Sequence, residues 1–278
     1  MPELPEVETV RSRLAPALAG RTFERVDILD ERLTRPFEPR TVAAELEGER
    51  VESVERRGKY LIFRFESGRD LLIHLRMTGS LRHARRGKLP DDPHRRAVVR
   101  LDDGSDVAYR DVRRFGTWLV LEPGELDEYL APRLGHEPLG TDFTPKELGS
   151  QLAGRRAPIK ALLLDQRLFA GVGNIYADEA LWYARVNPLR PGGELTPAEL
   201  RAIYRGVRKA LEIGIARQGA TLREYSTPDG SPGGMQHAFR VYGRAGEPCE
   251  RCGTPIEKTR AGGRGTWYCP ACQPRQPA

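Results

Sequence analysis

The sequence predicts an α+β fold, in which an N-terminal β-sandwich with flanking helices precedes a helical region and a small cysteine-containing segment. Short runs of β-branched and aromatic residues, separated by turn residues, fill residues 22–121 and are typical of a sandwich or a barrel. Apolar residues at helical spacing dominate residues 144–219. All four cysteines lie after residue 248.

The length of 278 residues fits two domains and a short appendage. Prolines and glycines concentrate in residues 122–143, which predicts a boundary there. We therefore expect an N-terminal domain over 1–130, a linker over 131–143, a helical domain over 144–238 and the cysteine segment over 239–278. No apolar run approaches the roughly 20 residues that span a bilayer, and the N-terminus lacks a signal-peptide core, so we expect a cytoplasmic protein.

The charge balance favours a polyanionic partner. Lysine and arginine number 45 against 39 aspartate and glutamate, a net charge of +6. Arginine dominates the basic residues, and its planar fork suits phosphate recognition. The alternative is that many of these arginines are solvated surface residues.

The first residues carry unusual chemistry. Loss of Met1 would expose the secondary amine of Pro2, next to Glu3. An α-amino group has a pKa near 8, so part of it is an unprotonated nucleophile at neutral pH, and Glu3 could move protons beside it. An iminium formed with a sugar aldehyde would be an electron sink. The alternative is that Pro5 opens a helix and Glu6 complements its dipole.

The N-terminal elements follow from periodicity. Val7, Val10, Leu14 and Leu18 predict a helix over residues 6–18, ended by Gly20. Turn residues predict two hairpins, and a further strand follows them; the predicted strands are 60–65 with 71–75, 98–101 with 107–109, and 118–121. The basic stretch 82–96 is expected to be a mobile loop.

Five residues of the β domain are candidates for function. Lys59 follows a glycine at the start of a strand, and His74 lies in an apolar strand, where a histidine is often structural. Met77, Arg113 and Phe115 are residue types that wedge into a base stack, because apolar side chains unstack a step and an arginine can fill the gap. Methionine is also a common gap-filler in cores, and spacing does not show that the three converge.

The second half reads as helices. Thr144 to Glu147 and Thr196 to Glu199 are capping boxes, the second opening a long helix that ends near Gly219, and 157–164 is a further helical run. A turn through Gly171 and Gly173 leads to Asn174 as the expected N-cap; such a helix start can bind phosphate, or be an ordinary corner. Residues 224–238 are rich in Ser, Gly and Pro and are expected to be a flexible loop.

The cysteines have the spacing of a four-thiolate zinc site. Cys249 and Cys252 form one Cys-x2-Cys pair, Cys269 and Cys272 the other, and 16 residues separate the pairs. Segments 255–258 and 266–268 are expected to pair as strands, with residues 260–264 as the turn. Four protein ligands leave no open position, so the metal should stabilise the fold.

The order of these motifs resembles that in bacterial formamidopyrimidine-DNA glycosylases. These enzymes belong to the same superfamily as endonuclease VIII. The motifs are Pro2-Glu-Leu-Pro-Glu6, Gly58-Lys-Tyr60, His74-Leu-Arg-Met-Thr-Gly79, Asp111-Val-Arg-Arg-Phe-Gly116, Gly171-Val-Gly-Asn-Ile-Tyr-Ala177 and the cysteine segment. The resemblance spans the chain and implies a helix–two-turn–helix domain. It also implies removal of oxidised purines from duplex DNA through a Schiff base, followed by β,δ-elimination.

The resemblance implies a role for each candidate residue. Pro2 would be the nucleophile at C1′, Glu3 the proton donor to the sugar oxygen, and Lys59 and Arg264 would complete the catalytic set. Lys59, His74, Asn174 and Arg264 would bind phosphates around the flipped nucleotide, and Lys160 would also contact DNA. Met77, Arg113 and Phe115 would fill the gap in the duplex, with Arg113 facing cytosine. The lesion pocket would comprise Glu6, Arg223, Ser226 and Gln236.

Two alternatives remain open from the sequence. One is a preference for oxidised pyrimidines within the same enzyme class. The other is a non-catalytic protein that binds damaged DNA on the same scaffold, as would follow if Met1 blocked the amine. We expect one structural Zn²⁺, a damaged double-stranded DNA partner, no membrane association and a monomer.

Overall fold

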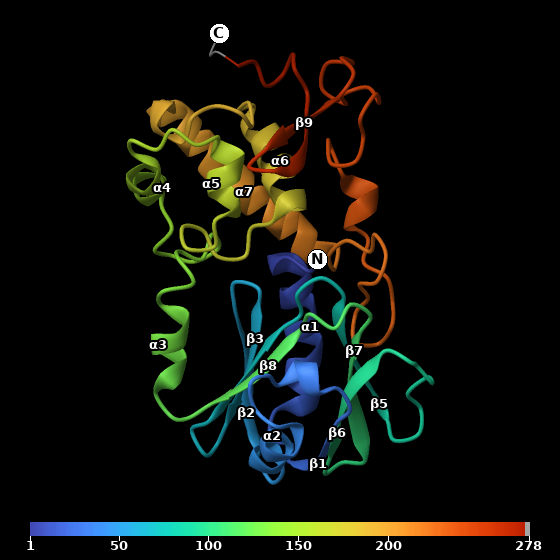
Figure 1. Ribbon diagram of the computed structural model, residues 1–278. Helices are drawn as coiled ribbons and strands as arrows, with labels where there is room; N and C mark the ends of the chain where they lie inside the picture. Colours follow the sequence, from blue (N-terminus) through green and yellow to red (C-terminus); the bar gives the residue numbers. More distant parts are fainter. Residues whose placement is uncertain (276–278) are drawn as a thin grey trace. The chain divides into compact units, whose positions relative to one another are not determined.

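The computed structural model describes residues 1–275, which form two compact units (Figure 1). The first comprises Met1–Pro132 together with Arg217–Gly234, and the second comprises Arg133–Ala216 together with the chain from Met235 onward. The segment Arg217–Gly234, expected in the helical domain, therefore packs with the N-terminal unit. Its Ala220 N–H donates to Glu6 and its Pro228 carbonyl accepts from His83, and both partners lie in the N-terminal unit.

The first unit is a β-sandwich with helices. Its elements are α1 (Leu4–Leu18), β1 (Phe23–Ile28), the 3-10 helix η1 (Glu31–Leu33), α2 (Pro39–Leu46), β2 (Val51–Arg57), β3 (Tyr60–Phe65), β4 (Asp70–His74), β5 (Gly79–Arg85), β6 (Arg95–Leu101), β7 (Ser105–Asp111), β8 (Thr117–Leu121) and α3 (Glu125–Leu130). Two antiparallel four-stranded sheets have the orders β1-β6-β7-β5 and β2-β3-β4-β8. Both predicted hairpins are confirmed, with Tyr60 opposite His74 in the first.

The core of this unit joins both sheets to α1. Val7, Val10, Leu14 and Leu18, which predicted the helix, are fully buried in one cluster with residues of both sheets, among them Phe63. The α1 helix contacts β2 and β3. Because each sheet is apolar on one face, closing the two over this helix removes both faces from water.

Two parts of the predicted β region differ from expectation. Residues 39–46 form α2, whose buried face is only Val42 and Leu46, too short a pattern to distinguish from a strand. The stretch 82–96 is not wholly a loop, because β5 extends to Arg85 and β6 starts at Arg95. Charged side chains on the half-exposed ends of these strands conceal the alternation, while pairing with β7 fixes the backbone.

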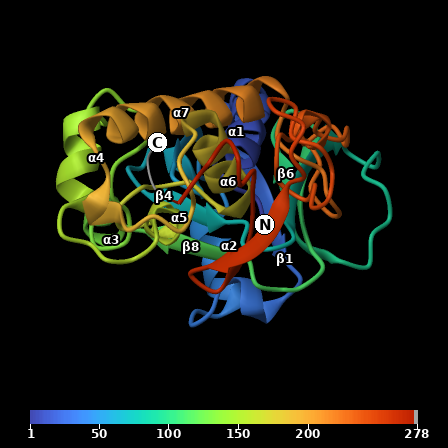
Figure 2. The same cartoon turned by 90° about the horizontal axis from the view of Figure 1, so that it is seen from above.

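The second unit is helical and ends in a small hairpin. Its elements are α4 (Pro145–Leu152), α5 (Ile159–Leu164), α6 (Asn174–Ala184), η2 (Gly192–Glu194), α7 (Pro197–Ala216), η3 (Met235–Ala238), β9 (Glu257–Ala261) and β10 (Arg264–Tyr268). α7 packs against α6 and α4, and α5 packs against α6 (Figure 2). Gly206 permits the close approach, since a Cβ there would lie 2.4 Å from the carbonyl oxygen of Ala180 on α6.

The capping predictions are mostly confirmed. The Thr144 hydroxyl accepts from the Glu147 N–H, and Thr196 and Glu199 exchange reciprocal bonds at the start of α7. The N-cap of α6 is Gly173 rather than Asn174, whose side chain instead donates to another segment. The β9–β10 turn is Gly262-Gly263, tighter than the expected 260–264. Among the helices of residues 1–275, none combines the length and apolar character needed to cross a membrane.

We predict that Gly116→Ala destabilises the first unit by about 1–3 kcal/mol, the usual range for overpacking a core. A Cβ at Gly116 would lie 1.6 Å from the hydroxyl of Tyr109, which is fully buried and stacked edge-on against Trp118. Gly234→Ala is the matched control, because its Cβ would meet only a carbonyl at 3.6 Å. Urea unfolding monitored by tryptophan fluorescence measures both; equal midpoints would contradict the prediction.

Candidate functional site

The N-terminal stretch is held by a capping box. Glu3 is the N-cap of α1, Pro5 lies in its first turn, and the Glu6 carboxylate accepts from the Glu3 N–H at 2.8 Å. The predicted helix opening is thus confirmed. Pro2 and Glu3 are buried at the start of this helix.

Glu6 also binds a segment 214 residues further along the chain. Its second oxygen accepts from the Ala220 N–H at 2.7 Å, and its backbone carbonyl accepts from the Tyr225 hydroxyl at 3.3 Å. Gly219 must be glycine here, because its φ is +77° and a Cβ would lie 2.7 Å from the Glu6 side chain. One carboxylate therefore ties the N-terminus to the start of residues 219–234.

Lys59 lies at the turn between β2 and β3. Gly58 has a φ of +58°, and the Lys59 side chain is buried. Arg56 donates to the Gly58 carbonyl at 3.0 Å and to Glu8 of α1 at 2.9 Å. The turn that carries Lys59 is therefore anchored to the same helix that begins after Glu3.

His74 ends β4 in a neutral state. Its Nδ1 accepts from the Arg76 N–H at 2.9 Å, which leaves the proton on Nε2. Burial, with Arg76 and Lys59 nearby, lowers the pKa of His74 to about 3. The structural and functional interpretations are therefore compatible, because a neutral Nε2–H group can donate a hydrogen bond to an anion.

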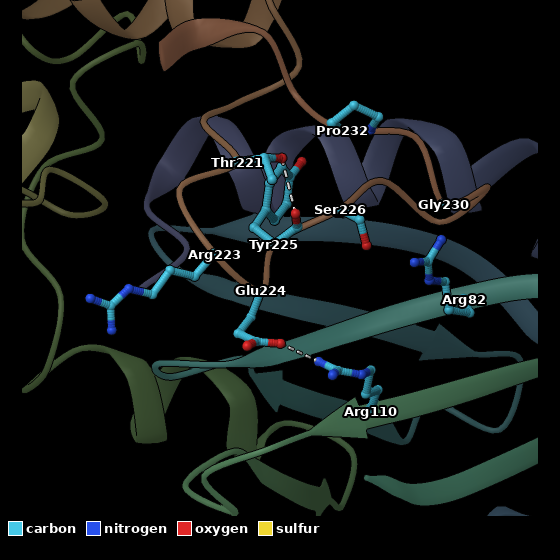
Figure 3. Close-up of a pocket in the computed structure, with 9 residues that line it drawn as sticks. All are labelled: Arg82, Arg110, Thr221, Arg223, Glu224, Tyr225, Ser226, Gly230 and Pro232. Atoms are coloured by element: carbon cyan, nitrogen blue, oxygen red, sulfur yellow. Dashed lines mark hydrogen bonds and ion pairs between the residues drawn. The ribbon is translucent and has the colours of Figure 1, made fainter. Parts of the chain in front are cut away.

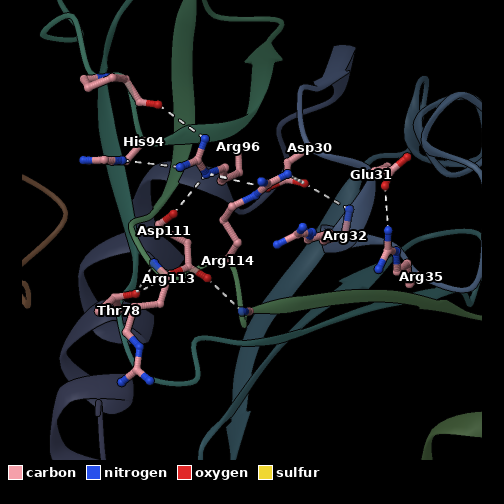
Figure 4. Close-up of polar contacts among 12 residues, drawn as sticks. Asp30, Glu31, Arg32, Arg35, Thr78, His94, Arg96, Asp111, Arg113 and Arg114 are labelled. Carbon is pink, nitrogen blue, oxygen red and sulfur yellow. Dashed lines mark hydrogen bonds and ion pairs between the residues drawn. The ribbon is translucent and has the colours of Figure 1, made fainter.

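Asp111 and Thr78 link the turn that contains Met77 to the loop that contains Arg113 and Phe115; Figure 4 shows Thr78, Asp111 and Arg113. The Thr78 hydroxyl donates to Asp111, and the Arg113 N–H donates to that hydroxyl at 2.9 Å. Met77 precedes Thr78, so this bond connects the turn after His74 to the loop after β7. The Arg113 guanidinium stands 4.7 Å from the centre of the Phe115 ring, and Met77 and Phe115 are exposed. Spacing alone did not reveal this link.

A polar pocket of about 330 Å³ lies between β5, β7 and the segment after α7 (Figure 3). Of the predicted lesion-pocket residues, Arg223 and Ser226 line it, and the other lining residues are Arg82, Arg110, Thr221, Glu224, Tyr225, Gly230 and Pro232. Glu6 supports the segment by holding Ala220. Gln236 lies in η3, within the second unit.

The sequence did not single out Arg82, Arg110 or Glu224 for this pocket. Arg110 pairs with Glu224 at 2.8 Å and with Asp92 at 2.6 Å, contacts between residues up to 114 positions apart. The His83 N–H donates to the Pro228 carbonyl at 3.0 Å, which adds a contact at the free edge of β5. The only sequence signal for Arg82 at this pocket is the alternation of side chains between the two faces of β5, and the charged side chains of that strand conceal it.

Lys160, which is expected to contact DNA, lies on α5 of the second unit. Its side chain is fully buried in the second unit, 2.8 Å from Asp178, and donates to the Gly265 carbonyl at 2.8 Å and the Thr266 hydroxyl at 2.9 Å. Burial raises the pKa of Asp178 to about 7. The sequence did not show the burial of Lys160, because a buried lysine and a surface lysine look alike in a helical run.

Asn174 and Arg264 meet at the same hairpin. The Asn174 amide donates to the Gly265 carbonyl at 3.1 Å, while the buried amide oxygen has no hydrogen-bond partner among residues 1–275. Arg264 begins β10 next to Gly265 and is exposed. Lys160 and Asn174 therefore hold the strand end that presents Arg264, although the three lie on different elements.

The four cysteines form a metal-binding cluster, as predicted. Their sulfur atoms lie within 4.8 Å of one another. The Trp182 indole N–H donates to Cys249 at 3.4 Å and the Cys272 N–H donates to Cys269 at 3.4 Å, bonds that suit negatively charged thiolates. Four convergent thiolates with donors around them fit a structural metal ion with no open position.

We predict that His74 makes stability pH-dependent. The folded pKa lies below the unfolded value near 6.5, so as pH falls the unfolded state binds the proton first. This contribution is complete above about pH 6.5 and is lost toward pH 3, with a slope of at most about 1.4 kcal/mol per pH unit. His74→Gln should flatten the fall in the free energy of unfolding between pH 6.5 and 4. Identical slopes for variant and parent would contradict the assignment.

We predict that removing the metal unfolds the hairpin without unfolding the first unit. Cys249→Ser should no longer bind the metal. The β9–β10 hairpin, which contains Trp267, should then become disordered, because a segment this small lacks a core of its own. Metal analysis and amide exchange of residues 246–275 provide the measurement, with Thr259→Ser on β9 as control. Retained metal and protection in Cys249→Ser would refute the site.

Comparisons with known proteins identify the relationship. The sequence model of the formamidopyrimidine-DNA glycosylase N-terminal domain matches residues 1–118, that of the formamidopyrimidine-DNA glycosylase H2TH domain matches 134–226, and that of a zinc finger found in FPG and IleRS matches 246–275. Formamidopyrimidine-DNA glycosylase of Symbiobacterium thermophilum is 48% identical, covering 99% of this chain and 90% of that protein. The enzyme of Thermus thermophilus is 46% identical, covering all of both chains.

Solved structures of similar fold lead to the same family as the sequence comparisons. The crystal structure of the Thermus thermophilus protein has a TM-score of 0.87 at 44% identity, covering 99% of this chain and all of that one. A Lactococcus lactis FPG mutant in complex with Fapy-dG-containing DNA has a TM-score of 0.91 at 36% identity, covering 98% and 100%. Fold and site thus define a DNA glycosylase of base-excision repair. More particularly, the chain belongs to the formamidopyrimidine-DNA glycosylase family.

Proposed function

We propose that this protein removes oxidised purines, such as 8-oxoguanine and formamidopyrimidines, from duplex DNA and then cleaves the abasic site. The observation that carries the proposal is the Glu6 bridge, 2.8 Å from the Glu3 N–H and 2.7 Å from the Ala220 N–H. It ties the terminus that would supply the nucleophile to the segment that lines the polar pocket of about 330 Å³. Related proteins have been solved in complex with DNA that contains Fapy-dG, carbocyclic 8-oxo-G or an abasic site.

The chemistry begins with removal of Met1, which converts the Pro2 nitrogen from an amide to a secondary amine. This amine attacks C1′ of the damaged nucleotide and the base departs. Glu3 protonates the ring oxygen, so that the sugar opens and the nitrogen becomes an iminium. The iminium weakens the C2′–H bond, and loss of that proton expels the 3′ phosphate by β-elimination. A second elimination expels the 5′ phosphate.

The remaining residues bind the substrate. A base inside a duplex must be extruded before C1′ is reached, at a cost of a few kcal/mol. Phosphate contacts from Lys59, the Nε2–H of His74, Asn174 and exposed Arg264 offset that cost. In the same proposal the exposed Met77, Arg113 and Phe115 fill the vacated space, with Arg113 facing the orphaned cytosine.

We propose that the four cysteines hold one Zn²⁺, whose role is structural. A set of four thiolates is a typical zinc ligand set, and the matched zinc-finger family supports the choice. Bound metal would hold the β9–β10 hairpin, in which Arg264 is the first residue of β10. The partner would be damaged double-stranded DNA, bound by a monomer.

The decisive experiment is borohydride trapping with the processed protein and an 8-oxoguanine:cytosine duplex. A covalent adduct through Pro2 is expected, and the same chain with Met1 retained is the matched control, because its blocked amine cannot form the iminium. Binding of abasic duplex without an adduct or cleavage would favour a non-catalytic protein. Faster excision of thymine glycol than of 8-oxoguanine would overturn the purine preference.

We predict that Glu3→Gln lowers base excision by about 10²–10⁴-fold, the usual contribution of a general acid. Glutamine can still accept the backbone hydrogen bond that Glu3 receives at the start of α1, so the helix should form. Single-turnover excision rates measure the effect, and circular dichroism checks the fold. Excision within a factor of about three of the parent rate would exclude Glu3 as the proton donor, since general acids contribute far more than that.

A further inference from the structure

The loop after β7, residues 112–116, presents two of the wedge residues. Asp111 fixes its ends, because one carboxylate oxygen accepts from the Arg113 N–H at 3.2 Å and the other from the Gly116 N–H at 2.8 Å. Between them stands Arg114, with a φ of +58°. This left-handed conformation is sterically disfavoured for a residue with a Cβ, so something must hold it.

Asp30 stabilises this conformation of Arg114. Its carboxylate accepts from both Nε and Nη2 of Arg114, the latter at 2.7 Å, in a bidentate fork (Figure 4). Asp30 is 5% exposed, and the hydrogen bonds from Arg114 keep the pKa of its carboxyl below the ordinary value despite burial. It also accepts from the Arg32 N–H at 3.1 Å, which fixes the carboxylate at the start of η1.

The side chains of Arg113 and Arg114 leave the loop in different directions (Figure 4). Figure 4 shows the Arg114 side chain running toward Asp30 while the Arg113 side chain leaves the loop on another side. Arg96 strengthens the same support, since it donates to the Asp111 carbonyl at 2.9 Å and lies 3.7 Å from Asp30. The loop is therefore anchored at its ends by Asp111 and at its centre by Asp30.

We propose that Asp30 is a positioning residue for the wedge, acting through Arg114 to hold Arg113 and Phe115 in the orientation that reads the base opposite the lesion. This inference rests on the proposed function of Arg113 and Phe115. Nothing in the motif that contains Arg114 points to Asp30, a residue 84 positions earlier in the chain. Without the fork, the left-handed residue loses its support and the loop samples other conformations.

The test uses Asp30→Asn, which keeps the shape of the side chain at position 30 but replaces the carboxylate that accepts from Arg114 with a neutral amide. Excision of 8-oxoguanine opposite cytosine should fall about tenfold in kcat/KM, and the preference for cytosine over adenine opposite the lesion should shrink at least about threefold, as expected for a lost charge-assisted fork. Cleavage of an abasic site in single-stranded DNA should change less than about twofold, because no opposite base is read. Asp27→Asn is the matched control, since Asp27 pairs with Arg25 on β1.

Two more variants keep the proposal falsifiable. Arg114→Lys keeps the positive charge at an exposed position, where the substitution should not disturb folding, but it cannot form the bidentate hydrogen bonds to Asp30. It should therefore reproduce the loss of opposite-base preference. In the double variant Asp30→Asn/Arg114→Lys the two losses should not add, because both changes remove the same contact. An unchanged cytosine preference in Asp30→Asn and Arg114→Lys, or equal losses on single-stranded abasic DNA, would overturn the inference. An inactive parent protein would instead refute the proposed function.

Discussion

The carboxylate of Glu6 is the constraint on which the first unit depends. It accepts one backbone N–H at the start of α1 and another in residues 219–234, so a single side chain joins two distant parts of the chain. A buried carboxylate is costly unless its oxygens are hydrogen-bonded, and here each oxygen has a backbone donor. Any shift of residues 219–234 away from α1 would leave one oxygen of the buried Glu6 carboxylate without its donor. The cost of losing that hydrogen bond opposes the shift.

The second unit uses the same principle with opposite charge. Lys160 is buried against Asp178 and donates its remaining hydrogen bonds to Gly265 and Thr266, so an ion pair inside the helical unit holds the tip of the β9–β10 hairpin. Glu179, the next residue of α6, accepts from the N–H groups of Arg240, Val241 and Tyr242. The metal cluster and these buried charges together order a part of the chain with little apolar core.

The candidate site residues of the first unit lie on loops that are fixed by charged side chains rather than by regular structure. Asp111 holds the loop that carries Arg113, Glu8 holds the turn that carries Lys59 through Arg56, and Arg110 holds the pocket wall through Glu224. Each anchor lies on a strand or helix of the sandwich. These anchors restrict the positions that the loop side chains can take, as a binding or catalytic site on a loop requires.

The sequence by itself determined the α+β class, the hairpins, the long α7 helix and the four-cysteine site, because these depend on local periodicity, turn residues and close spacing. It also predicted Pro2 and Glu3 as reactive groups from their chemistry. Tertiary structure alone decided that Arg217–Gly234 belongs with the N-terminal unit, that Lys160 is buried, and that Asp30 anchors Arg114. These pairings join residues between 18 and 214 positions apart, and hydrogen-bond partners at such separations follow from how the chain packs, which no local pattern records.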